Sequence, residues 1–265
     1  GVVTLGDGDD SFTFESDGSL LLPIVSGGIQ GGDGGETNGD DLIFAGTVDY
    51  DVAMDALPVS GFENLVKAGS NIWTLTAAGA GTSFQSITVD GGTLVLIGAW
   101  TVTGNTTTVN SGDTLTIGDG GIDSSLHEMG DLDVSGTFNV VNMGTVTVDG
   151  TTTVFSGGIV NVDTGATPGV LTAQAVDVQT GGTLNVHGAM SSTTTMVAGN
   201  LTVLTTGGYT ASGTTTVATN GTLRVEGAGD YNANGAVLVS GGVLDLAGGT
   251  FDAALTTTIS AGQLN

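Results

Sequence analysis

Small groups of apolar residues recur along most of this chain at nearly constant intervals. One position in each group is usually Val, and these anchor residues are Val89, Val109, Val134, Val154, Val178, Val197, Val217, Val239 and Ile259. The anchors run from residue 89 to residue 259 in eight steps, which gives about 21 residues per repeat. Internal repetition at such a period is typical of proteins built from stacked structural units.

After most anchors a short turn rich in Gly, Asn or Ser leads to two apolar residues separated by one polar residue. This alternation has the period of a β-strand with one buried face. We therefore expect the apolar positions of these strands to point inward, among them Leu115, Val140, Val162, Val186, Val203 and Val225. Their neighbours should point outward: Thr116, Asn139, Asn161, Asn185, Thr202 and Arg224.

A third apolar site lies eight residues before many anchors. It holds Leu126, Val146, Val170, Tyr209, Tyr231 and Phe251, whereas Met190 stands seven residues before Val197. Three short strands and three turns fit a coil of about 21 residues, and Gly, Thr, Val and Asn disfavour helix. The sequence predicts an all-β fold, a right-handed parallel β-helix (β-solenoid) of about twelve coils spaced about 4.8 Å apart.

The first 60 residues follow this pattern less regularly and carry 12 of the 27 acidic residues. A strand-like apolar run at residues 20–25 is interrupted by Pro23. We interpret residues 1–60 as irregular acidic Gly/Asp-rich coils that continue into the regular repeats of residues 61–265. We also expect the chain to be a fragment of a longer protein.

Charge excludes several classes of partner. Lys67 and Arg224 are the only Lys and Arg residues, and the net charge is −25. Such a chain cannot neutralise phosphates, so we expect neither nucleic-acid binding nor binding to an anionic membrane. Cysteine is absent, and no apolar run reaches the roughly 18 residues of a membrane helix. We expect no membrane insertion of this segment, and secretion without disulfides.

The acidic turns near the start offer one candidate metal site. Residues 5–13 (LGDGDDSFT) match most of the calcium-binding nonapeptide, and residues 31–36 and 38–41 echo parts of it. Carboxylate and backbone oxygens in a Gly-permitted turn suit a hard cation. Two interpretations remain open: solvated acidic turns with no cofactor, or calcium bound by Asp7, Asp9, Asp10, Asp33, Asp40 and Asp41.

Other candidate chemistry is sparse. His127 and His187 lie 60 residues apart with no cysteine nearby, which argues against zinc. Asp131 and Asp133 share one face of a strand, and a carboxylate pair could serve glycoside hydrolysis. Solvated, outward carboxylates are the better explanation, because solenoid lyases generally need a basic residue and only two exist.

Several segments resemble the passenger-associated repeat of bacterial autotransporters. In that repeat a Gly-Tyr-Thr-like strand, a Thr-rich strand ending in Val and a Gly-Thr-Leu-x-Val strand follow one another. Residues 208–217 (GYTASGTTTV) and 221–225 (GTLRV) match all three, and residues 181–186 and 91–96 match the third. Residues 62–69 (FENLVKAG) and 72–76 (IWTLT) resemble the junction before such repeats, although Asn71-Ile72 stands where Gly-Thr is usual.

The resemblance implies a passenger domain of the adhesin type, located outside the cell or on the bacterial outer surface. Its function would be that of a structural or adhesive stalk, acting in adhesion or in cell–cell and biofilm association. Two alternatives remain: a self-assembling extracellular fibre or surface-layer subunit, and a polysaccharide-active β-helix enzyme. We expect no enzymatic activity, and we expect the solenoid ends to contact further coils or another copy.

Overall fold

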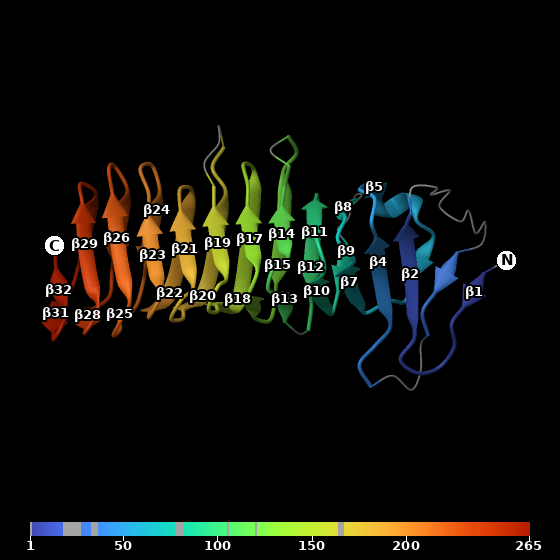
Figure 1. Cartoon of the computed structure of the whole chain (residues 1–265), viewed down its shortest axis with the longest axis horizontal. Helices are drawn as coiled ribbons and strands as arrows, with labels where there is room; N and C mark the ends of the chain where they lie inside the picture. The colour runs from blue at the N-terminus through green and yellow to red at the C-terminus, as the bar shows by residue number, and fades with distance from the viewer. Residues whose placement is uncertain are drawn as a thin grey trace.

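The computed structural model describes residues 2–17, 28–32, 37–77, 82–104, 106–119, 121–163 and 167–265. Over these residues the regular secondary structure is β-strand apart from a single turn of 3-10 helix, η1 (Met54–Ala56), and there is no α-helix. Successive coils stack along one long axis, and the two termini lie at opposite ends of the stack (Figure 1). The described residues include no helix that is long and apolar enough to cross a membrane.

Strands of successive coils pair in parallel and form three faces. Face 1 contains the anchor residues: β2 (Ser11–Ser16), β4 (Asp41–Gly46), β7 (Asn64–Ala68), β10 (Ser86–Asp90), β13 (Thr107–Val109), β16 (Leu132–Val134), the later parts of β18 (Gly144–Val154), β20 (Val170–Val178) and β22 (Ala189–Val197), then β25 (Thr215–Val217), β28 (Val237–Ser240) and β31 (Thr257–Ser260).

Face 2 is an 11-stranded sheet: β5 (Tyr50–Ala53), β8 (Ile72–Thr76), β11 (Thr93–Ile97), β14 (Thr114–Ile117), β17 (Thr137–Val140), β19 (Ile159–Val162), β21 (Thr183–Val186), β23 (Asn200–Val203), β26 (Thr222–Glu226), β29 (Val243–Ala247) and β32 (Gln263–Leu264). Face 3 contains β9 (Thr82–Phe84), β12 (Ala99–Val102), β15 (Ser124–Glu128), the first parts of β18, β20 and β22, and then β24 (Gly208–Ala211), β27 (Asp230–Ala233) and β30 (Thr250–Ala253). A small sheet of β1 (Val3–Thr4), β3 (Ile29–Gln30) and β6 (Val59–Ser60) lies near the N-terminal end.

The anchor residues form one continuous column on face 1. Strand register pairs each anchor with the next, and the column extends upstream of Val89 through Lys67 and Phe44 to Phe14. From Phe14 to Ile259 the column takes eleven steps, or about 22 residues per coil. The expected β-solenoid is confirmed, with a coil slightly longer than the predicted 21 residues.

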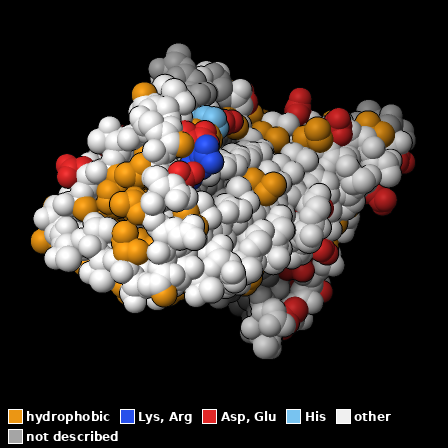
Figure 2. Space-filling model, turned by 60° about the vertical axis from the view of Figure 1, so that its left-hand side comes forward, with side chains coloured by type: hydrophobic (Ala, Val, Ile, Leu, Met, Phe, Trp, Pro, Cys, Tyr) orange, Lys and Arg blue, Asp and Glu red, His pale blue; other side chains and the backbone are white. Residues whose placement is uncertain are grey.

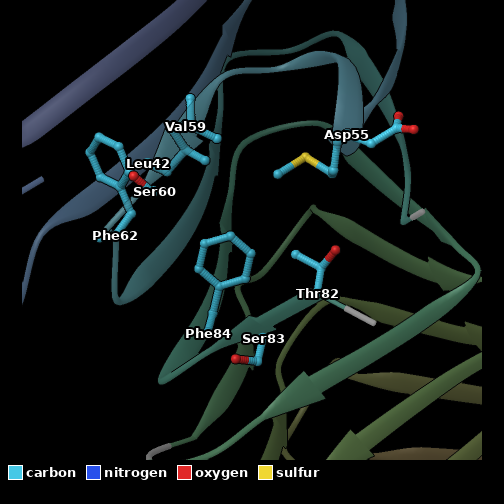
Figure 3. A pocket seen from close by; sticks show the side chains of 10 residues that line it. Leu42, Asp55, Val59, Ser60, Phe62, Thr82, Ser83 and Phe84 are labelled. Atoms are coloured by element: carbon cyan, nitrogen blue, oxygen red, sulfur yellow. The ribbon is translucent and has the colours of Figure 1, made fainter. Parts of the chain in front are cut away.

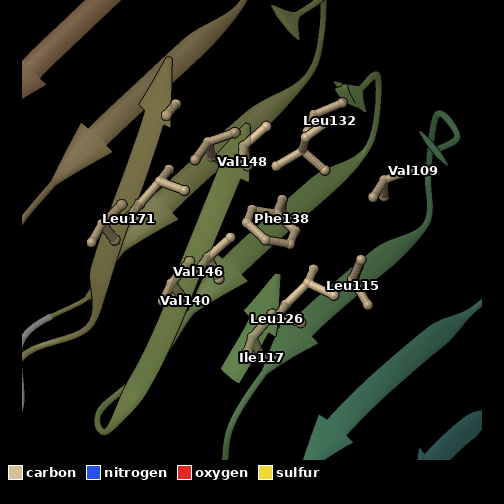
Figure 4. Close-up of a cluster of buried hydrophobic side chains, with 14 of the residues drawn as sticks. Val109, Leu115, Ile117, Leu126, Leu132, Phe138, Val140, Val146, Val148 and Leu171 are labelled. Carbon is tan, nitrogen blue, oxygen red and sulfur yellow. The ribbon is translucent and has the colours of Figure 1, made fainter. Parts of the chain in front are cut away.

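The interior of the solenoid is a continuous apolar core, because each coil buries its inward side chains against the next (Figure 4). Every side chain that we expected to face inward on face 2 is fully buried. Their polar neighbours point outward, and Asn139, Asn161 and Asn185 form a ladder of amides. Asn161 Nδ2 donates to Asn139 Oδ1 at 2.9 Å, and Asn185 Nδ2 donates to Asn161 Oδ1 at 2.9 Å.

One predicted core position is wrong. We expected Val170 at the third site, but Leu171 is fully buried and Val170 is only half-buried. Leu171 pairs with Val146 of the preceding coil and Met190 of the following coil. The cause is a register irregularity in β18 between Val148 and Thr151. Because the bulge places one extra residue in β18, the third site lies eight residues before the anchor in β18 but only seven residues before it in the partner strand β20.

The glycine that opens the Gly-Thr-Leu-x-Val strand is required by close packing between coils. A Cβ atom added at Gly221 would lie 2.0 Å from the carbonyl oxygen of Val197 in the preceding coil. At Gly182 it would lie 2.4 Å from the carbonyl oxygen of Val154. No side chain fits at such distances, so glycine allows the turn to approach the neighbouring backbone.

Tyr209, Tyr231 and Phe251 stack in one column, as the sequence predicted. Their ring centroids are 5.0 Å and 5.5 Å apart, with interplanar angles of 12° and 9°. The hydroxyl of Tyr209 lies 2.9 Å from Thr195 Oγ1, and that of Tyr231 lies 2.8 Å from Thr215 Oγ1. Burial raises the pKa of Tyr209 to about 12. The rings fill the core, and their hydroxyls are satisfied inside it.

Candidate functional site

The acidic residues of the N-terminal coils lie in turns that backbone amides already bind. Asp9 Oδ1 accepts hydrogen bonds from the amides of Thr37 at 2.7 Å and Asn38 at 3.0 Å, and Asn38 Nδ2 donates to Asp9 Oδ2 at 2.9 Å. The backbone hydrogen bonds from Asn38 and Thr37 lower the pKa of Asp9. Asp9 therefore links two successive turns as a carboxylate.

Asp40 and Asp41 point in opposite directions because they are adjacent in an extended segment. Asp40 is fully buried and accepts hydrogen bonds from the amides of Asp10, at 2.7 Å, and Gly32. Asp41 faces outward, and its Oδ1 accepts a hydrogen bond from Asn64 Nδ2 at 3.0 Å. These two carboxylates therefore cannot share one cation.

The expected calcium ligands are not gathered in the described part of the chain. No group of three or more His, Asp or Glu residues there is placed to hold a metal ion. Asp10 Oδ2 is buried without a hydrogen-bond partner, whereas Asp7 is exposed. Asp33 lies outside the described residues, so calcium binding that depends on it stays a prediction.

Lys67 is the most unusual charged residue, because it occupies the anchor column and is fully buried. Its ammonium donates to four oxygens: Ala68 O at 2.7 Å, Gly91 O at 2.8 Å, Gly69 O at 2.9 Å and Asn71 Oδ1 at 3.1 Å. Burial lowers the pKa of Lys67 to about 8, against the opposing effect of Asp113 and Asp49. The side chain ties a turn of one coil to the turn of the next.

Asn71 extends this connection toward the N-terminal coils. Its Nδ2 donates to Ser16 Oγ at 2.7 Å and to Val48 O at 2.8 Å, while its Oδ1 accepts from Lys67. In the sequence, Asn71 stood out only because Asn71-Ile72 occupies the place where Gly-Thr is usual in the autotransporter junction that the segment resembles. The structure gives the reason for that departure, because this amide bridges a buried ammonium and a buried hydroxyl.

The other basic side chain is held on the surface. Arg224 on β26 forms ion pairs with Glu226, Nε to Oε1 at 2.6 Å, and with Asp245, at 3.2 Å. All three side chains are partly exposed, so these pairs contribute little stability. Lys67 is buried, whereas Arg224 is partly exposed and paired with two carboxylates.

Asp131 and Asp133 do lie on one face, next to a buried acid. Asp131 Oδ1 accepts a hydrogen bond from the amide of Thr151 at 2.7 Å. Partial burial, and then the neighbouring Asp131, raise the pKa of Asp133. Glu128 on β15 is fully buried, and burial raises its pKa to about 7. Because Glu128 is fully buried, it cannot contact a substrate. Asp133 is therefore the one partly exposed carboxyl of this cluster whose pKa is raised.

The two histidines remain apart, as expected. His127 is exposed, and its Nε2 lies 3.1 Å from Asp149 Oδ2. His187 is half-buried at a turn after β21. Neither histidine contacts a second potential metal ligand in a cluster among the described residues.

A pocket of about 280 Å³ with a mixed polar and apolar lining opens beside η1, where the N-terminal coils meet the regular ones. Phe62 and Val59 face Phe84 and Thr82 across it, whereas the carboxylate of Asp55 points away from the ring of Phe84 (Figure 3). Among the described residues that line the pocket, Asp55 is the one with a titratable side chain. The pocket can hold a small apolar group but offers no acid–base pair.

The C-terminal end of the stack exposes apolar side chains. Leu255 is 61% exposed, Leu264 55% and Ile259 42%. A space-filling view shows apolar side chains gathered over the C-terminal coils (Figure 2). The C-terminal end of the stack is therefore an apolar surface.

No protein-family model matches the chain, and no curated protein matches it. Among solved structures, the crystal structure of a TibC-catalyzed hyper-glycosylated TibA fragment is similar, with a TM-score of 0.34 and 16% identity. The match covers 98% of this chain and 100% of that one.

Proposed function

We propose that this chain is a structural and adhesive stalk segment of a secreted or surface-displayed bacterial passenger protein. It would act in adhesion or in cell–cell and biofilm association. One observation carries the proposal: a single anchor column continues from Phe14 to Ile259, so the coils form one long stacked unit. Such a unit presents long shallow faces that suit extended, multivalent contacts.

The passenger assignment and the extracellular location are supported by the repeat motif. Residues 208–225 fold as β24, β25 and β26, three consecutive strands of one coil, as the autotransporter repeat would require. Coils without cysteine can form one after another with no disulfide, which suits a chain that crosses a membrane unfolded. We also propose that the segment has no hydrolase, lyase or protease activity. The burial of Lys67 and the ion pairs of Arg224 support this view.

Surface display tests the stalk proposal. A non-adherent bacterium would carry the chain on a display anchor, with an equal amount of the anchor alone as the control. We expect faster settling of the cells, or stronger attachment to a surface, than with the anchor alone. If both strains behave alike at equal display, the adhesive proposal is wrong.

The exposed C-terminal end favours a second candidate, a fibre or surface-layer subunit. Such an end could contact further coils or a second copy of the chain, because its apolar side chains and strand edges lack neighbours. Light scattering of the purified chain should then show mass increasing with concentration. Thr258→Asp combined with Ile259→Asp should reduce that increase. A strictly monomeric wild-type chain would contradict assembly through this end.

A further inference from the structure

A polar groove of about 710 Å³ crosses the outer surface of face 1 at its N-terminal end. Its floor is formed by the first residues of three adjacent strands, Asp41 on β4, Asn64 on β7 and Ser86 on β10, which the strand register places in one row. Thr88 lies in the parallel outward row, and Gln85 and Glu63 precede the strands. The groove thus runs across the strands, from coil to coil.

The lining is dominated by groups that bind hydroxyls. Amides offer both donors and acceptors, carboxylates accept, and Ser and Thr hydroxyls do both. An alcohol group is also both a donor and an acceptor. A row of amide, carboxylate and hydroxyl side chains therefore suits a ligand chain that carries hydroxyls at regular intervals. Between the coils of Asp41 and Thr106 the groove spans three strand spacings, or about 14 Å.

Several of these side chains are held in place by each other. Asn64 is almost fully buried; its Nδ2 donates to Asp41 Oδ1 at 3.0 Å and to Asn38 O at 2.9 Å, and its Oδ1 accepts from Ser86 Oγ at 2.7 Å. Glu63 Oε2 accepts the amide of Asp40 at 2.8 Å. No hydrogen bond from the described residues reaches Asp41 Oδ2 or Glu63 Oε1. The oxygens that face the groove are therefore positioned in advance of any ligand, which lowers the entropic cost of binding.

Charge narrows the class of ligand. Two carboxylates line the groove and no Lys, Arg or His does. Phosphates, sulfates and sugar acids would be repelled, because nothing there neutralises them. A peptide cannot add as a strand, since β4, β7 and β10 each pair with a coil on both sides and offer no free edge.

We propose that this groove binds a neutral oligosaccharide chain laid along the solenoid axis. The exposed hydroxyls of the sugar would bond with Asp41, Glu63, Gln85 and Thr88, and Val66 offers a small apolar surface for the C–H face of a ring. If the chain is adhesive, as proposed above, this groove would supply the class of ligand. Binding of the sugar itself does not depend on the adhesive function.

Two matched variants test the groove. Thr88→Arg places a long cation inside it, and Thr216→Arg places the same side chain in the same outward column, several coils away. Both threonines are half-buried, so the two changes cost similar stability. The probes are cellohexaose, maltohexaose, mannohexaose and, as a charged comparison, hexagalacturonate, with binding measured by saturation-transfer NMR and calorimetry on the purified chain.

We expect at least one neutral hexasaccharide to bind the wild-type chain, with hexagalacturonate bound at least tenfold more weakly. Thr88→Arg should weaken binding at least tenfold, and Thr216→Arg should leave it unchanged. The proposal is overturned if no neutral probe binds at millimolar concentration, if both variants weaken binding equally, or if octalysine binds while the sugars do not. If cells that display the chain still adhere, the stalk proposal stands and only the groove proposal is wrong.

Discussion

The buried carboxyl of Glu128 makes the stability of the solenoid depend on pH. Its side chain points into the core between Val102 and Val148 of the neighbouring coils. Thr107 Oγ1 donates to one carboxyl oxygen, and the amide of Gly130 donates to the other at 2.9 Å. Burial raises the pKa of Glu128 from 4.5 to about 7, these hydrogen bonds oppose the rise, and the charge of Asp131 adds slightly to it.

The sign of the effect follows from proton binding. Between pH 4.5 and pH 7 the folded chain holds a proton on Glu128 that the unfolded chain has released, so this contribution to stability is complete below pH 4.5. It is lost as the pH rises through 7. A pKa of about 7 in place of 4.5 corresponds to about 3 kcal/mol of free energy of unfolding.

The variant Glu128→Gln removes the ionisation and keeps the shape. Its amide oxygen can accept from Gly130, and its NH₂ group can donate to Thr107 Oγ1. We expect the variant to match the wild-type chain near pH 4 and to be more stable by about 3 kcal/mol at pH 8. Urea unfolding followed by circular dichroism at half-unit pH steps measures this difference.

Glu15→Gln is the matched control, because it makes the same change from carboxyl to amide at an exposed position. All other ionisable groups are common to both chains, so their contributions cancel in the difference. If the wild type and Glu128→Gln lose stability in parallel from pH 5 to pH 8, Glu128 has an ordinary pKa and the argument fails.

Three further predictions concern other polar groups of the stack. Lys67→Met should lower the free energy of unfolding by about 3 kcal/mol at pH 7 because the carbonyls around the ammonium lose their donors, and chemical unfolding would show it; a loss below 1 kcal/mol would contradict the buried contacts. Asn161→Asp should cost about 1 kcal/mol more than Asn161→Thr, because it removes the donor to Asn139, and equal unfolding midpoints would contradict the amide ladder. Millimolar calcium should leave the melting temperature unchanged if the acidic turns bind no cation, because a cation would have to displace the amides bound to Asp9; a rise reversed by chelation would support the calcium interpretation instead.

The fold could be predicted because the anchor column is written directly in the sequence. From Val89 to Ile259 each coil contributes Val or Ile at one position, and alternation then places its neighbours inside or outside. The same alternation rule also holds at two charged residues for which we made no prediction. Lys67 shares its parity with Leu65, and Glu128 with Leu126, so alternation alone would have placed both charged side chains in the core.

Other features could not be predicted because they depend on contacts between coils. The seven-residue spacing at Leu171 follows from an irregularity in the preceding strand, and two adjacent apolar residues leave the choice between Val170 and Leu171 open. The carbonyls that make burial of Lys67 tolerable come from turns on two coils, including Gly91. A charge is accepted inside a core only when such acceptors surround it, and local sequence does not reveal them.

The difference between inner and outer columns also explains why the function is harder to predict than the fold. Inner columns are apolar in most coils, because each coil must pack on the last, and Lys67 and Glu128 are exceptions. Outer columns carry no such constraint, so their residue types vary from coil to coil. The groove arises where Asp41, Asn64 and Ser86, each 22 or 23 residues from the next, come to lie in one row. No local motif marks this row, and only the strand register brings its carboxylate, amide and hydroxyl together. Binding sites on a solenoid should therefore be sought by comparing outward residues one coil apart.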